Sequence, residues 1–177
     1  GLMWLTGTAE TARLRVGIPI ADLLAGYFAA MGIMAALLER EASGKGQWIE
    51  TSLLEAMVGS LSFQAGKYLN TGEVPPPVGN HHPLTAPMGV YRAKDGYLNL
   101  AVGNDEMWRR FCKAVEFPVL ADDPRFAKVS GRVKNRRALD ECVEEALARR
   151  TVAEWVEVLN AAGVACGPIY TVDQVFA

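Results

Sequence analysis

The chain has 177 residues, of which 50% are hydrophobic and 21% are charged, an ordinary globular composition. This composition excludes a disordered tail, a collagen-like repeat and a highly charged arm. Eighteen Lys and Arg residues against twenty Asp and Glu residues give a net charge of −2. Nothing in the overall charge favours binding to phosphate backbones, so we expect no nucleic-acid partner.

The cysteines and the N-terminal residues indicate the setting of the protein. Three cysteines lie far apart, at positions 112, 142 and 166. An odd number without close spacing argues against a disulfide scaffold and fits a reducing compartment, so we expect a cytoplasmic protein. The chain begins Gly-Leu-Met-Trp, without an initiator Met, a cationic segment or a signal peptide. We therefore expect a piece from inside a longer protein.

A long apolar run, residues 16–38, contains one charged residue, Asp22. A run of this length is formally a candidate for a membrane span. Pro19 suits the first position of a helix better than the centre of a bilayer, and small residues let other backbones approach closely. We expect a buried helix over 20–41 and no membrane partner. The small residues are Gly26, Ala29, Ala30, Gly32, Ala35 and Ala36.

The next segments alternate in type up to a proline-rich stretch. Residues 47–52 have high β propensity and predict a short strand. Apolar residues at three- and four-residue steps predict a helix over 53–69. Prolines then crowd residues 75–87, which predicts a stiff linker at a domain boundary.

The segment after the linker predicts a second α/β unit. Residues 88–92 and 97–102 flank an Asp-Gly turn, a hairpin signal. Asn104 is placed to cap the next helix, and a further helix is expected around 133–147. Thr151 and Glu154 form a capping-box pattern for a helix that ends at Gly163.

Several familiar catalytic and binding motifs do not fit. The turn Gly44-Lys45-Gly46 is neither a P-loop nor a dinucleotide fingerprint. His81 and His82 are adjacent, without a further ligand at metal-binding spacing, so we expect no metal site. Basic residues clustered over 128–137 are most simply a solvated helix face.

Asp22 has two interpretations on residue type alone. Buried carboxylates are rare unless they are paired or functional, and a poorly hydrated carboxylate suits a nucleophile or a base. An acidic residue in the first turn is also common for dipole reasons, and it then only caps its own helix.

An ordered series of short motifs resembles the class III CoA-transferase family, also called the CaiB/BaiF family, which includes formyl-CoA transferase and α-methylacyl-CoA racemase. The resemblance covers essentially the whole chain in the family's order. Its longest motif is RVGIPIADLLAG over 15–26. The others are SGKGQ over 43–47, SLLEA over 52–56, GNHHP over 79–83, NDEMW over 104–108, DPRF over 123–126 and GVACGP over 163–168.

The resemblance implies a fold and partners. It implies an α/β protein in which residues 1–74 belong to a large Rossmann-like CoA-binding domain and residues 88–177 form a small α/β domain. Two such subunits would interlock as a homodimer. The implied partners are a coenzyme A thioester and a small carboxylic acid, both substrates, with no cofactor.

The resemblance also implies roles for three residues. Asp22 aligns with the nucleophile of the family's transferases, which attacks an acyl-CoA thioester and forms covalent aspartyl intermediates. His82 and Asn80 fall in the family's Gly-Asn-x-His-Pro stretch and are assigned to substrate binding. Residues 78–85 take the place of a glycine-rich oxyanion loop, and the CoA-contacting residues stay unassigned.

Two alternatives to CoA transfer stay open. One is racemase-type epimerisation at the carbon α to the thioester, in which Asp22 acts in acid–base chemistry. The residues after Asp22, Leu23 to Gly26, resemble the transferases more closely. The other alternative is a non-catalytic fragment that keeps the fold as a binding or assembly element. We expect residues 1–177 alone to be inactive.

Overall fold

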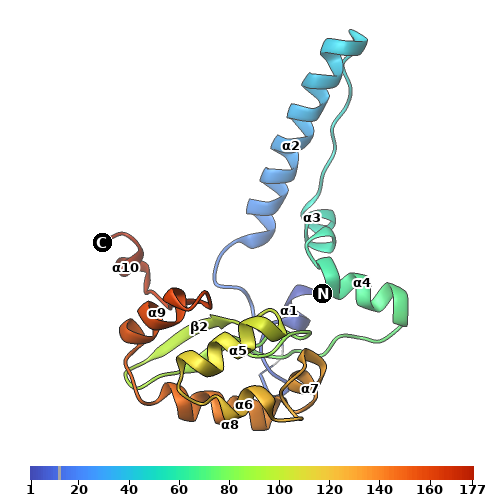
Figure 1. Cartoon of the computed structure of the whole chain (residues 1–177). Coiled ribbons are helices and arrows are strands. Elements are labelled where there is room, and N and C mark those ends of the chain that lie inside the picture. The colour runs from blue at the N-terminus through green and yellow to red at the C-terminus, as the bar shows by residue number, and fades with distance from the viewer. Residues whose placement is uncertain (12) are drawn as a thin grey trace. The chain divides into compact units, whose positions relative to one another are not determined.

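A computed structural model describes residues 1–11 and 13–177 (Figure 1). The described residues divide into two compact units, Gly1–Gly79 and Asn80–Ala177, called unit 1 and unit 2 below. The division falls within the stretch predicted as a linker. The assignment of residues 1–74 and 88–177 to a large and a small family domain stays a prediction.

Unit 1 is helical over its described residues. Its helices are α1 (Leu2–Leu5), α2 (Ile20–Ser43), α3 (Leu53–Gly59) and α4 (Ser62–Thr71). The helix α2 begins directly after Pro19 and ends at Gly44, whose φ of 70° is left-handed and costs glycine little. The Gly44 N–H donates to the Arg40 carbonyl at 2.8 Å. The predicted helix over 20–41 is therefore confirmed and ends two residues later.

The burial expected for α2 is not found within the described residues and stays a prediction for the complete protein. None of its residues is buried, and Leu38 is 75% exposed. The helix α3 packs against it, but a short helix cannot cover the apolar surface of one with 24 residues. By length and composition alone α2 passes the test for a membrane span, a test that core helices of globular proteins also pass.

Two further predictions for unit 1 need correction. Residues 47–52 are extended but form no strand, because the described part of unit 1 contains no other strand to pair with them. They run beside α2 instead (Figure 1), where the lack of a side chain at Gly32 leaves room for Ile49. The single helix expected over 53–69 is two helices, α3 and α4, separated near Ser62, whose φ is 50°.

Unit 2 contains an antiparallel sheet in the order β1-β2-β3. The strands β1 (Met88–Arg92) and β2 (Tyr97–Ala101) pair from Met88 with Ala101 to Arg92 with Tyr97, so the predicted hairpin is confirmed. The strand β3 (Ala165–Pro168) pairs with β2. Sequence analysis missed β3 because Gly167 and Pro168 are rare in strands.

The helices of unit 2 are α5 (Asp105–Ala114), α6 (Val119–Asp122), α7 (Val129–Lys134), α8 (Arg136–Leu147), α9 (Val152–Ala161) and α10 (Val172–Val175). The predicted caps are confirmed: Asn104 Oδ1 accepts the Met107 N–H at 2.8 Å, and Thr151 and Glu154 form a complete capping box. The helix expected around 133–147 is split into α7 and α8 at Asn135.

The hydrophobic core cluster lies entirely in unit 2. Trp108 is fully buried, stacks on Phe111 with ring centroids 5.5 Å apart and meets Phe126 edge-on. The Trp155 indole N–H donates to the Leu147 carbonyl at 2.7 Å. Around this core, α8 packs on β1, and α9 packs on β2 and β3. The predicted α/β class is confirmed.

Candidate active site

Asp22 lies in the first turn of α2. Backbone N–H groups in a first turn lack helical acceptors, and the positive end of the helix dipole favours a carboxylate there. The side chain is exposed, in contrast to the poorly hydrated site considered from sequence. No hydrogen bond or ion pair of its carboxylate is found among residues 1–11 and 13–177, and it makes no capping hydrogen bond. The simple capping interpretation therefore has no support here.

Asn80 and His82 lie on one loop of unit 2, which runs antiparallel to the start of β1. The Val90 N–H donates to the Asn80 carbonyl at 3.2 Å, and the His82 N–H donates to the Met88 carbonyl at 2.8 Å. His81 forms an isolated bridge with Gly89 between these two bonds. The loop is thus tied to the sheet at both candidate residues.

Gly89 makes this close approach possible. Its φ is 147°, a conformation that residues with side chains rarely adopt. A Cβ atom at this position would overlap the Asn80 carbonyl oxygen and crowd His81. Only glycine fits where the loop lies against β1.

The His82 ring is held by its own turn. The Leu84 N–H donates to His82 Nδ1 at 3.2 Å, and the Thr85 hydroxyl lies 3.1 Å from the same nitrogen. Since a backbone N–H can only donate, Nδ1 is the acceptor and the neutral ring carries its proton on Nε2. The Thr85 hydroxyl then also donates to Nδ1.

Two arginines between residues 128 and 137 hold this loop from the helical side. Arg132 is fully buried, and its Nε donates to the Ala86 carbonyl at 2.7 Å. Arg136 Nη2 donates to the carbonyls of His82 and Thr85, at 2.7 and 3.2 Å. The solvated helix face expected from sequence is therefore wrong for these two residues.

Asp140 of α8 contacts both His81 of the loop and Tyr91 of β1. Tyr91 donates its hydroxyl to Asp140 Oδ1 at 2.8 Å, and His81 Nε2 lies 3.8 Å from Asp140 Oδ2. Burial raises the pKa of both Tyr91 and Asp140, although the hydrogen bond from Tyr91 opposes the rise at Asp140. Sequence analysis assigned no role to any of these three.

Cys112 and Cys166 do not supply a nucleophile. Burial raises the pKa of Cys112 to about 12 and that of Cys166 to about 11. Neither thiol is ionised near neutral pH, and the thiolate is the reactive form. Both residues pack with the core instead.

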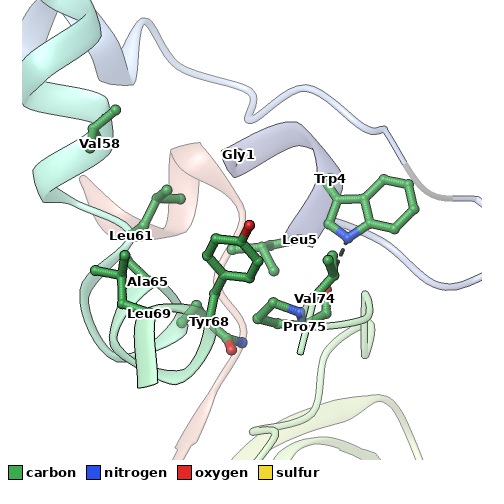
Figure 2. A pocket seen from close by; sticks show the side chains of 11 residues that line it. Gly1, Trp4, Leu5, Val58, Leu61, Ala65, Tyr68, Leu69, Val74 and Pro75 are labelled. Carbon is green, nitrogen blue, oxygen red and sulfur yellow. Dashed lines mark hydrogen bonds between the residues drawn. The ribbon is translucent and has the colours of Figure 1, made fainter. Parts of the chain in front are cut away.

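An apolar groove lies within unit 1, and none of the candidate residues lines it (Figure 2). Its volume is about 430 Å³. Figure 2 shows Tyr68 of α4 facing Val74 and Pro75, and the Trp4 indole N–H donating to the Pro75 carbonyl at 2.9 Å. Among the described residues, the lining contains no carboxylate, histidine or cysteine.

Within the described part of the chain, no group of three or more His, Cys, Asp or Glu side chains is arranged to hold a metal ion.

The three predicted site residues fall into two sets. Asn80 and His82 share one ordered loop of unit 2, and Asp22 begins the long helix of unit 1.

Comparison with known sequences decides the family. The sequence model of CoA-transferase family III matches residues 1–177. The chain belongs to CoA-transferase family III. The resemblance found in its motifs is thereby confirmed over the whole chain.

Curated relatives of this family III chain are named CoA-transferases. Acetyl-CoA:oxalate CoA-transferase of Acetobacter aceti is 36% identical over 175 residues, which are 98% of this chain and 45% of the relative. Succinyl-CoA:glutarate CoA-transferase of Mus musculus is 33% identical over 177 residues, which are 100% of this chain and 41% of the relative. The chain spans less than half the length of these relatives.

Solved structures agree with the family assignment. A CaiB/BaiF family protein from Brucella suis matches with a TM-score of 0.78 and 38% identity, over 99% of this chain and 47% of that one. Rv3272 from M. tuberculosis matches with a TM-score of 0.85 and 28% identity, over 99% of this chain and 46% of that one. The family III fold is therefore shared along nearly all of the described chain.

Proposed function

We propose that the complete protein moves coenzyme A from an acyl-CoA donor to a small carboxylic acid, with Asp22 as the nucleophile. The observation that carries this proposal is the family III match over residues 1–177. The matched residues include a carboxylate, Asp22, in the first turn of a helix whose next charged residue is Glu39. The proposed reaction uses no metal or cofactor, because the acyl-CoA donor already carries the activated thioester and the acceptor supplies only a carboxylate.

The proposed reaction begins with two covalent steps at Asp22. A carboxylate oxygen of Asp22 attacks the thioester carbonyl carbon, the C–S bond breaks, and CoA leaves as a thiolate. The product is a mixed anhydride. The thiolate then attacks the aspartyl carbonyl, the donor acid leaves as a carboxylate, and an aspartyl-CoA thioester remains.

The second half repeats these steps with the acceptor. The acceptor carboxylate attacks the aspartyl-CoA thioester, and CoA thiolate leaves. The thiolate attacks the acceptor carbonyl of the new anhydride and releases the Asp22 carboxylate. A carboxylate nucleophile gains from water exclusion, so we propose that Asp22 is covered in the complete enzyme.

We assign Asn80 and His82 to the acyl and acceptor groups of the substrates. Loop residues on a rigid scaffold commonly carry such contacts. Both residues are bonded through their backbone to β1, and Arg136 of α8 also holds the His82 carbonyl. Residues 78–85 are the proposed location of the donors that stabilise the oxyanion.

Transfer is favoured over epimerisation. The relatives reported above are named CoA-transferases, and residues 23–26 resemble that branch. We further propose that the complete protein is a cytoplasmic homodimer. Sedimentation of the complete protein tests the dimer, and carbonate extraction of membranes tests its location.

The direct test of the function compares two carboxylates on one helix. In the complete protein, Asp22→Ala should lower CoA transfer at least about 1,000-fold, because it removes the nucleophile. Glu39→Ala, near the other end of α2, should leave transfer unchanged. Near-normal transfer by Asp22→Ala would overturn the assignment. Loss of the α-proton to deuterated water without transfer would identify a racemase instead.

A further inference from the structure

A stripe of charged residues on α7 and α8 contacts the loop and β1 at successive points. The stripe is Arg132, Arg136, Asp140 and Glu144, each four residues from the next. Arg136, Asp140 and Glu144 lie along one face of α8, and Arg132 precedes them on α7. Arg132 donates to the carbonyl of residue 86, and Arg136 donates to the carbonyls of residues 82 and 85. Asp140 contacts the side chains of residues 81 and 91. Glu144 accepts the N–H of residue 92.

Arg136 is the second residue of this stripe, and its side chain contacts both ends of the turn that carries His82. A single nitrogen, Nη2, donates to the carbonyls at both ends of the turn, His82 and Thr85. The Nη1 atom of Arg136 is buried and has no hydrogen-bond partner among the described residues. The guanidinium is thus committed to the loop backbone and not to solvent.

The two carbonyls that Arg136 holds belong to the turn that fixes the His82 ring. Nδ1 of that ring accepts from the Leu84 N–H and from the Thr85 hydroxyl. If the carbonyls of residues 82 and 85 shift, the donors to Nδ1 shift with them. A change at the guanidinium would therefore reach the tautomer and direction of the ring through the turn.

We propose that Arg136 is a positioning residue that holds the His82 ring in its Nε2-protonated tautomer. The importance of this ring for substrate rests on the proposed function, but the positioning itself does not. The helix α8 offers a matched control: Arg137 is the next residue, its side chain is 94% exposed, and it pairs with Glu141 at the surface.

The first test reads the ring directly in the complete protein. Nitrogen-15 NMR of labelled histidine distinguishes the two tautomers, and comparison with His82→Ala assigns the signal. We expect Arg136→Gln to change the His82 signal from one tautomer to a mixture, Arg136→Lys to change it less, and Arg137→Gln to leave it as in the parent. A parent-like tautomer in folded Arg136→Gln protein would overturn the proposal.

The second test reads the consequence for substrate. Arg136→Gln should raise the KM for the acceptor acid about tenfold, with a smaller change in the KM for the acyl-CoA donor. In a His82→Ala background the same substitution should add little, because its effect passes through that ring. Additive effects would indicate a merely structural role and contradict the proposal. If the parent protein transfers no CoA, the proposed function fails, and the NMR result still decides the positioning.

Discussion

The Nη2 atom of Arg132 and the Oδ1 atom of Asp105 lie 3.0 Å apart, and this ion pair joins α7 to the first turn of α5. The same guanidinium donates to the carbonyls of Ala86 and Phe126. One buried cation therefore links the loop before β1, the segment before α7 and the helix α5. Its removal would leave three acceptors without their donor.

We expect Arg132→Met to lower the free energy of unfolding of the protein by about 3 kcal/mol, the usual size of the effect when one partner of a buried pair is removed. Lys134→Met, on the same helix at an exposed position, should change stability little. Urea unfolding of both variants measures the difference. Equal midpoints for the two would show that the buried network adds nothing.

The ion pair should also make stability depend on pH. Desolvation opposes the charged form of Asp105, but the hydrogen bond and charge of Arg132 outweigh it, so its pKa lies below the ordinary value of 3.8. The unfolded state then binds the proton at a higher pH than the folded state does. The stability from this group is present above pH 3.8 and is lost as pH falls through the folded-state pKa.

Asp105→Asn should therefore be less stable than the parent at neutral pH and should lose less stability on acidification. The two curves of unfolding free energy against pH should converge at low pH. Parallel curves would show that the pair does not shift the titration of Asp105.

Gly89→Ala should displace the loop that carries Asn80 and His82, because the added Cβ would overlap the Asn80 carbonyl. We expect the free energy of unfolding to fall by about 2 kcal/mol, because a side chain is forced into this backbone conformation. Gly96→Ala is the control, since its Cβ would make an ordinary contact with Val152 at 3.6 Å. Thermal unfolding of both variants measures the effect. A Gly89→Ala protein as stable as Gly96→Ala would contradict the close approach.

Local signals predicted the parts of the fold that depend on neighbouring residues. The Asp-Gly hairpin, the Asn104 cap and the Thr151–Glu154 capping box are each contained within a few residues, and all three are confirmed. The strand expected over 47–52 was wrong because a strand depends on partners far away in the sequence.

In the candidate site, too, the local motifs could be predicted and the long-range contacts could not. The motifs marked Asp22, Asn80 and His82, but their spacing gave no sign that Arg132 and Arg136 face the loop. The sequence does not show which of the five basic residues over 128–137 are buried, because their burial depends on tertiary packing. Arg132 is fully buried while the Arg137 side chain is 94% exposed. The four-residue spacing from Arg132 through Asp140 was the one sequence signal that these side chains face the same neighbour. The break between α7 and α8 at Asn135 weakens that signal, because the spacing then crosses two helices.

Residues 1–177 alone should be catalytically inactive and should associate through α2. Every residue of that helix lies outside the buried core, including Tyr27 at 63% and Met31 at 59% exposure. Exposed apolar surface of this extent favours association. Hydrogen exchange should show stronger protection in unit 2, which holds the core. Stronger protection of α2 in a monomer, established by sedimentation, would contradict this expectation.

The central claim is that Asp22 forms a covalent bond to the substrate. The most direct measurement is mass spectrometry of the complete protein after incubation with an acyl-CoA donor and hydroxylamine, which attacks the aspartyl-CoA thioester and leaves a hydroxamate on the side chain. We expect a hydroxamate on Asp22, formed only when acyl-CoA is present and absent from Asp22→Ala. A protein that transfers CoA at full rate while Asp22 stays unmodified, or that carries the hydroxamate on another carboxylate, would contradict it.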